Sequence, residues 1–198
     1  GGEAGGASAP EPTGTPASAA EGAGADPAAE PTDEAEYFRV LVPIARPDSA
    51  PSYVSLAERL AQGHDRTPIV QVLTVTQIPD QTPQEMVVDT AGKRADRIEE
   101  ILAEDDHPVE YTIEAHTCRD VAFDVLQTAR DDGADLILMG YPEESDELTE
   151  TVEYAAPCDV VFASGFNGED FQSVAVGAGG GPHHGAALPM VRALGTQG

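Results

Sequence analysis

The fold class is decided by a short apolar stretch, Gly133-Ala-Asp-Leu-Ile-Leu-Met-Gly140, in the second half of the chain. Its inner residues, 134–139, have the length of one strand and are nearly all apolar. A strand that is apolar on both faces is typical of a parallel sheet covered by helices on each side. The flanking sequence should therefore alternate between strands and helices.

That alternation is present on both sides of the stretch. Runs of branched apolar residues predict further strands, and apolar residues at helical spacing predict helices between them. Gly63 is expected to stop the first helix. The sequence predicts a doubly wound, right-handed, five-stranded parallel sheet with helices on both faces. The predicted strands are 38–45, 68–76, 109–115, 134–139 and 159–163, and the helices carry Tyr53 and Leu60, Val87 and Leu102, Val121 and Ala129, and Leu148 and Ala155.

Composition and repetition divide the chain into three parts. Residues 1–36 contain small residues, proline and acids without any basic or aromatic residue, and this predicts a disordered acidic linker. Residues 37–166 hold the predicted sheet. Residues 167–198 are expected to begin a second, similar domain, because an offset of 134 residues pairs Val40 with Val174 and Leu60 with Leu194. We expect this last part to be loose or to pack on the first domain, and we expect the chain, which starts without methionine, to be a piece of a longer protein.

The chain is strongly acidic, with 36 acidic and 10 basic residues and a formal net charge of −26. This balance repels phosphate groups and disfavours nucleic acid as a partner. Nine of the basic residues are arginine and the acids are spread along the chain, a pattern that looks like a halophilic, haloarchaeal cytosolic protein. No stretch approaches the roughly 18 apolar residues needed to span a bilayer, so we expect a cytoplasmic location. Cys118 and Cys158 are expected to be free thiols, because they lack metal-ligand spacing.

Four segments resemble the universal stress protein family: Val40-Leu-Val-Pro-Ile44, Ile69-Val-Gln-Val-Leu73, Gly133–Gly140 and Ala156-Pro-Cys-Asp-Val-Val161. The resemblance implies a flavodoxin-like sheet and a homodimer or tandem pseudo-dimer, joined through the last strand. Members of the family bind ATP or have lost it, so ATP stays open as a cofactor. The acidic linker, the repeat and the missing start also resemble the cytosolic tail of haloarchaeal amino-acid permeases. That likeness would place the chain at the cytosolic face of a membrane, fused to a transporter.

The family's nucleotide motif is altered in this sequence. In ATP-binding members an aspartate ends the first strand, and a glycine-rich run follows the fourth. Here Ala45 stands at the aspartate position, and Gly140 matches the first glycine of the run. The next two glycine positions hold Glu143 and Glu153, and Tyr154 replaces the hydroxyl residue. Glycines let backbone N–H groups approach phosphate, whereas carboxylates repel it, so we expect a degraded nucleotide cleft.

A second glycine-rich loop follows the predicted strand of the second copy. Gly179, Gly180 and Gly181 lie between that strand and a predicted helix, where a loop could cradle phosphate. The loop fits neither common dinucleotide- nor triphosphate-binding fingerprint, so a plain connection and a nucleotide loop both remain open. We expect a regulatory or interaction module; the alternative is an ATP-binding stress-response protein that uses the cleft at Ala45 and Gly140 or this loop.

No catalytic or metal-binding set is predicted, and we expect no enzyme. His116-Thr-Cys-Arg-Asp120 places an imidazole, a thiol and a carboxylate together, the group types of a nucleophile and its base. The family resemblance implies an ordinary short turn at this place. His183 and His184 have no Cys, Asp or Glu within a few residues, so we expect a solvated pair rather than metal ligands.

Overall fold

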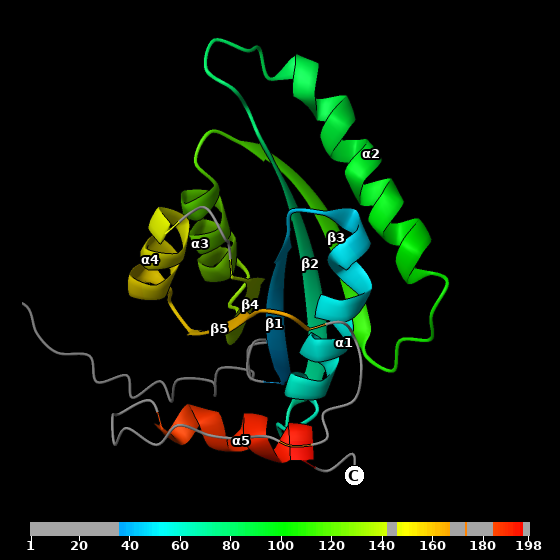
Figure 1. Cartoon of the computed structure of the whole chain (residues 1–198), viewed down its shortest axis with the longest axis vertical. Coiled ribbons are helices and arrows are strands. Elements are labelled where there is room, and N and C mark those ends of the chain that lie inside the picture. The colour runs from blue at the N-terminus through cyan, green and yellow to red at the C-terminus, as the bar shows by residue number, and fades with distance from the viewer. Residues whose placement is uncertain (1–35, 142–145, 167–172, 174–183, 196–198) are drawn as a thin grey trace, which may run out of the picture. The chain divides into compact units, whose positions relative to one another are not determined.

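The computed structural model describes residues 36–141, 146–166, 173 and 184–195, and all of them belong to one compact unit, residues 31–198. Five parallel strands form a single sheet in the order β3-β2-β1-β4-β5 (Figure 1). This confirms the predicted fold class. The strands are β1 Tyr37–Ile44, β2 Thr67–Gln77, β3 Glu110–Cys118, β4 Leu136–Gly140 and β5 Asp159–Ala163; the helices are η2 Pro47–Ser49, α1 Ala50–Ala61, α2 Glu85–Leu102, α3 Val121–Asp131, α4 Asp146–Ala155 and α5 His184–Gly195.

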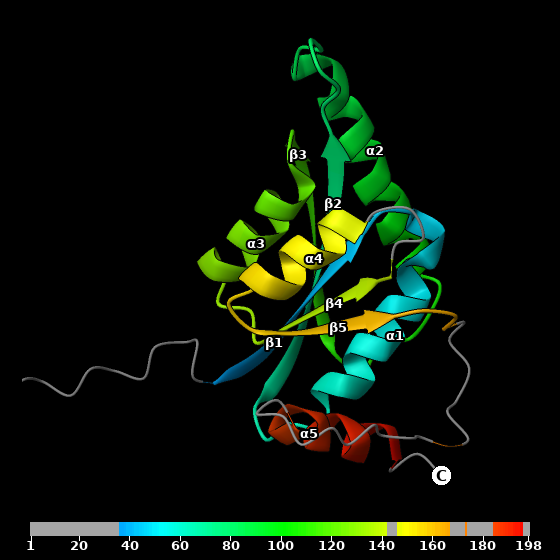
Figure 2. The ribbon, with the colours of Figure 1, turned by 60° about the vertical axis from the view of Figure 1, so that its left-hand side comes forward.

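Helices cover both faces of the sheet, and each face has its own apolar core. Helices α1 and α2 pack on one face, and α3 and α4 pack on the other (Figure 2). Alternate residues of the central strands point to opposite cores, as the two-residue period of a strand requires. Val40 and Leu136 enter the first core, whereas Leu41 and Ile137 enter the second. Burial on both faces explains why β1 and β4 are almost wholly apolar.

The single acid of the deciding stretch, Asp135, fixes the start of β4 against β1. Its Oδ2 accepts a hydrogen bond from the backbone N–H of Arg39 at 2.9 Å, and its Oδ1 lies 2.6 Å from Nη2 of Arg66. The Arg66 guanidinium also lies over the ring of Phe38, 5.2 Å from its centroid. One carboxylate thus ties three chain segments together at the amino end of the sheet.

The third strand is longer than the sequence predicts. β3 continues to Cys118, so His116 and Cys118 belong to the strand and not to a turn. The reason is non-local, because β2 runs to Gln77 and offers β3 backbone partners as far as the pair of Gln77 and Cys118. An edge strand with mixed polar and apolar residues carries too weak a periodic signal to mark this end.

The described end of the chain forms α5, which packs against the end of α1. Met190 and Leu194 lie against the first core. Gly63 follows α1, as expected for a stop, yet its φ is not in the left-handed region. A Cβ at Gly63 would lie 2.7 Å from the carbonyl oxygen of Pro189 and 2.8 Å from Cβ of Ala193. Glycine is therefore needed there for close approach of α5. The strand predicted for the second copy, which begins near Val174, lies outside the described residues. No described helix is both long and apolar enough to cross a membrane.

Replacing Gly63 by alanine should loosen α5 from the domain. The added methyl group collides with backbone of α5, and overpacking of this kind costs about 1–3 kcal/mol. Limited proteolysis should then cut within 184–195 faster than in the wild type. Gly92→Ala is the matched control, because nothing lies within 4 Å of a Cβ at that position. Equal cleavage rates for the Gly63 and Gly92 variants would contradict the packing of α5 at this site.

Candidate functional site

A cleft of about 560 Å³ opens at the carboxyl ends of β1 and β4. β2, which follows β1 in the chain, pairs on one side of β1, whereas β4 pairs on the other side. The cleft therefore lies where the strand order reverses. Ligands of open parallel sheets bind at such a point. Ala45 and Gly140 both line it, although they are far apart in the sequence. We call it the β1–β4 cleft; its lining residues are Pro43, Ile44, Ala45, Arg46, Ser49, Tyr53, Val75, Thr76, Gln77, Arg94, Val121, Val125, Met139, Gly140, Tyr141 and Leu148.

Tyr53 of α1 fills the space beside Gly140. Its hydroxyl donates a hydrogen bond to the carbonyl oxygen of Ala163 in β5 at 3.3 Å. A Cβ at Gly140 would lie only 2.6 Å from that hydroxyl, closer than real Cβ atoms approach. Close contact with Tyr53 therefore explains why a glycine stands at position 140, without a bound phosphate group.

Two arginines give the cleft a positive character within an acidic chain. Arg46 follows Ala45, and Arg94 reaches in from α2. Nη1 of Arg94 makes only long contacts, 3.4 Å to the carbonyl oxygen of Val75 and 3.5 Å to Oγ1 of Thr76. Among the ion pairs of the described residues, neither arginine has a carboxylate partner. No sequence pattern marks Arg94 or Tyr53 as a cleft residue, and Arg46 carries a local signal only through its position next to Ala45.

Two other residues of the altered nucleotide motif, Glu153 and Tyr154, lie away from the residues that line the cleft. Glu153 and Tyr154 lie in the last turn of α4, and the Tyr154 side chain is 84% exposed. Both residues line a separate hollow with Cys158 at the start of β5. Glu143, together with the loop residues Gly179, Gly180 and Gly181, lies outside the described residues. Of the predicted nucleotide residues, the structure therefore brings together Ala45 and Gly140.

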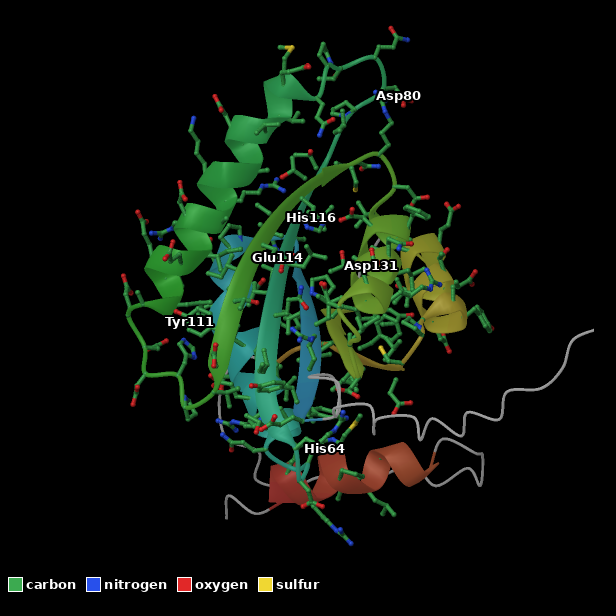
Figure 3. The ribbon with its side chains drawn as sticks, turned by 180° about the vertical axis from the view of Figure 1, so that it is seen from behind. His64, Asp80, Tyr111, Glu114, His116 and Asp131 are labelled. Carbon is green, nitrogen blue, oxygen red and sulfur yellow. The ribbon has the colours of Figure 1, made fainter. Side chains whose placement is uncertain are left out.

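The residues of the His116–Asp120 segment have separate structural partners. Nδ1 of His116 lies 3.0 Å from Oδ2 of Asp124, and its Nε2 lies 3.5 Å from Oε2 of Glu114 (Figure 3). Asp120 caps α3 by accepting a hydrogen bond from the backbone N–H of Phe123. Burial, with Asp124 and Asp120 adding to it, raises the pKa of the Cys118 thiol to about 11. A thiol that stays protonated is a poor nucleophile.

Both cysteines are free, as expected. Burial, followed by the charges of Asp159 and Asp135, raises the pKa of the Cys158 thiol to about 11 as well. Each thiol is only partly exposed. Neither has the lowered pKa that marks a reactive cysteine.

No protein-family model matches the chain, and no curated protein matches it. Solved structures with a similar fold include three universal stress proteins. The protein from Archaeoglobus fulgidus is 17% identical, with a TM-score of 0.46 over 64% of this chain and 93% of its own. UspA from Lactobacillus plantarum is 19% identical, with a TM-score of 0.49 over 65% and 99%. A universal stress protein family protein from Arabidopsis thaliana, solved with AMP bound, is 11% identical, with a TM-score of 0.45 over 63% and 90%.

Proposed function

We propose that the chain is a regulatory or interaction module of universal stress protein type whose degraded nucleotide cleft no longer binds ATP. The main observation behind this proposal is the close approach of Tyr53 to Gly140. A Cβ at Gly140 would lie 2.6 Å from the Tyr53 hydroxyl. The Tyr53 hydroxyl lies beside Gly140 on the side where a Cβ would stand, so contact with this side chain accounts for the glycine. Ala45 offers no polar side chain just after β1, and Glu153 and Tyr154 belong to a helix instead of a phosphate loop.

Charge supports the same proposal. The sequence after Gly140 contains Glu143, Glu144, Asp146 and Glu147 within a chain of net charge −26. Each of these carboxylates repels a triphosphate that carries three to four negative charges. The raised pKa values of both thiols disfavour thiol chemistry. We expect such a module to act through protein contacts.

A second candidate, an ATP-binding stress-response protein, is favoured by the size and charge of the β1–β4 cleft. The volume of about 560 Å³ is that of a typical small-molecule site. Arg46 and Arg94 would supply the charge for a bound phosphate. In this case the cleft would hold the nucleotide without the family's glycine run.

Isothermal titration calorimetry of ATP into this chain at high salt distinguishes the two functions. We expect no saturable binding below a dissociation constant of about 1 mM, the weak end of specific affinity. Arg94→Gln tests the second candidate, with Arg97→Gln as its control, because Arg97 lies on the same helix and pairs with Glu100 at the surface. Saturable ATP binding that is lost in the Arg94 variant alone would overturn the degraded cleft.

The partners and the chain context follow from the sequence resemblance. β5 forms one edge of the sheet, and we propose that a second copy, or the second domain of a tandem, pairs there.

The acidic linker and the repeat support a further proposal, that the module is the cytosolic tail of an amino-acid transporter. Sequencing the gene upstream of Gly1 tests this proposal. An upstream reading frame without apolar membrane-spanning segments would contradict it.

A further inference from the structure

The residues that line the β1–β4 cleft differ in charge from the rest of the chain. The chain holds 36 acidic residues, yet none of the described residues that line the cleft is Asp or Glu. The two charged lining residues are Arg46 and Arg94. A concave site that carries only positive charge attracts anions. The cleft therefore suits an anionic ligand, although the chain as a whole repels anions.

Arg94 and Thr76 offer hydrogen-bond donors to such a ligand. Nη1 of Arg94 lies 3.4 Å from the carbonyl oxygen of Val75 and 3.5 Å from Oγ1 of Thr76. Both contacts are long, because N–H···O hydrogen bonds usually measure about 2.7–3.2 Å, so the guanidinium keeps donors for a ligand. Thr76 is only 6% exposed, and no hydrogen bond between described residues uses its hydroxyl proton. A buried hydroxyl of this kind favours a ligand that accepts its proton.

Apolar side chains form most of the remaining lining of the cleft. They come from the sheet and from the helices that cover it, and they are Ile44, Val75, Val121, Val125, Met139 and Leu148. Burial of apolar surface is the dominant favourable contribution to most association. The volume of about 560 Å³ gives room for a carbon skeleton as well as a charged group. The cleft thus offers both cationic donors and apolar contact surface.

A carboxylate suits these donors better than a nucleotide phosphate does. Arginine binds a carboxylate through two parallel N–H···O hydrogen bonds. Phosphate sites of the glycine-loop kind use backbone N–H groups, and this sequence has Glu143 and Glu153 at two of the glycine positions. A ligand with one negative charge is also repelled less by a chain of net charge −26 than a triphosphate is.

We propose that the β1–β4 cleft binds a small carboxylic acid with an apolar body, whose carboxylate pairs with Arg94 and accepts a hydrogen bond from Thr76. This inference rests on the proposed function, because a cleft that no longer binds ATP is free for another ligand. Helices α1, α2, α3 and α4 each contribute a lining residue, so a bound ligand links all four. Such a ligand would give the regulatory module a small-molecule signal.

Isothermal titration calorimetry of 1-naphthaleneacetate into this chain at high salt tests the site. 1-Naphthaleneethanol has the same rings without the charge, and 1-naphthyl phosphate carries a phosphate group in its place. We expect saturable binding of a single acid molecule per chain. The alcohol should bind about tenfold more weakly or worse, since it lacks the charged hydrogen bonds. Equal binding of acid and alcohol, or tighter binding of the phosphate, would overturn the carboxylate class.

Variants of the two donors locate the bound acid. Arg94→Gln should weaken its binding about tenfold or more, and Thr76→Val about threefold or more, because each removes a donor to a charged group. Arg97→Gln is the matched control and should bind as the wild type does, since Arg97 lies on the same helix and pairs with Glu100 at the surface. Thr76→Val decides the question if Arg94→Gln fails to fold. Equal binding by the wild type and the cleft variants would overturn the site.

ATP titration of the same protein separates this inference from the proposed function. Absence of binding for both ATP and 1-naphthaleneacetate would overturn the carboxylate site and leave the degraded nucleotide cleft in place. Saturable ATP binding would overturn the degraded cleft and, with it, this inference. Binding of the acid without binding of ATP is the result that both proposals expect.

Discussion

Leu41→Ala is expected to lower the free energy of unfolding by about 3–5 kcal/mol, the range for a leucine lost from a tight core. Leu41 is fully buried in β1, which lies between β2 and β4. Its side chain packs in the second core with Leu73 and Ile137, beneath α3 and α4. Rigid strands on both sides leave little room for the cavity to collapse. Urea unfolding at high salt, followed by circular dichroism, measures the loss.

Leu188→Ala provides the control for the Leu41 variant. The Leu188 side chain is 62% exposed on α5, so the same truncation removes little buried surface. We expect a change within about 0.5 kcal/mol, as for surface substitutions in general. Similar losses for Leu41 and Leu188 would contradict a core centred on β1.

The central strands could be predicted because their signal is local. β1 and β4 are buried on both faces, so each is a nearly continuous apolar run. The end of β3 could not be predicted, since its last residues are polar and take strand geometry only because Gln77 of β2 is there to pair with Cys118. The local sequence pattern thus predicts the buried strands. It does not predict where the edge strand ends, because that end depends on pairing with β2.

The same distinction explains what could be predicted of the candidate site. Ala45 follows β1 and Gly140 is the last residue of β4, so the rule for the carboxyl ends of parallel strands brings them together. Arg94 belongs to α2 and Tyr53 to α1. No spacing in the sequence indicates which turn of each helix lines the cleft.

Removing His107 should destabilise the protein nearly as strongly as removing Leu41. Nδ1 of His107 lies 3.0 Å from Oε1 of Glu58, and both side chains are only 7% exposed. The pair joins α1 to the segment before β3, and the ring of Tyr111 in β3 lies edge-on to the imidazole. His107→Ala leaves the Glu58 carboxylate buried without this partner, and the loss of one member of a buried pair costs about 3 kcal/mol at pH 7. Urea unfolding at that pH measures it.

The pH dependence of the His107→Ala defect identifies its cause. Burial raises the pKa of Glu58 above its usual 4.5, while His107, a hydrogen bond from the Val109 backbone and Arg59 oppose the rise. A carboxyl with a raised pKa binds its proton more tightly in the folded state, so its contribution to stability is complete below pH 4.5 and is lost as the pH rises through the raised value.

Without His107 the pKa of Glu58 should rise further, because a lowering influence is gone. The defect of His107→Ala should therefore be smallest well below pH 4.5, where Glu58 is protonated in both folded proteins, and grow toward pH 7. In the Glu58→Gln background the same substitution should show no such growth, since no buried carboxyl remains to ionise. A defect that is constant with pH would instead assign the loss to packing of the imidazole against Tyr111, and the buried charge would not be its cause.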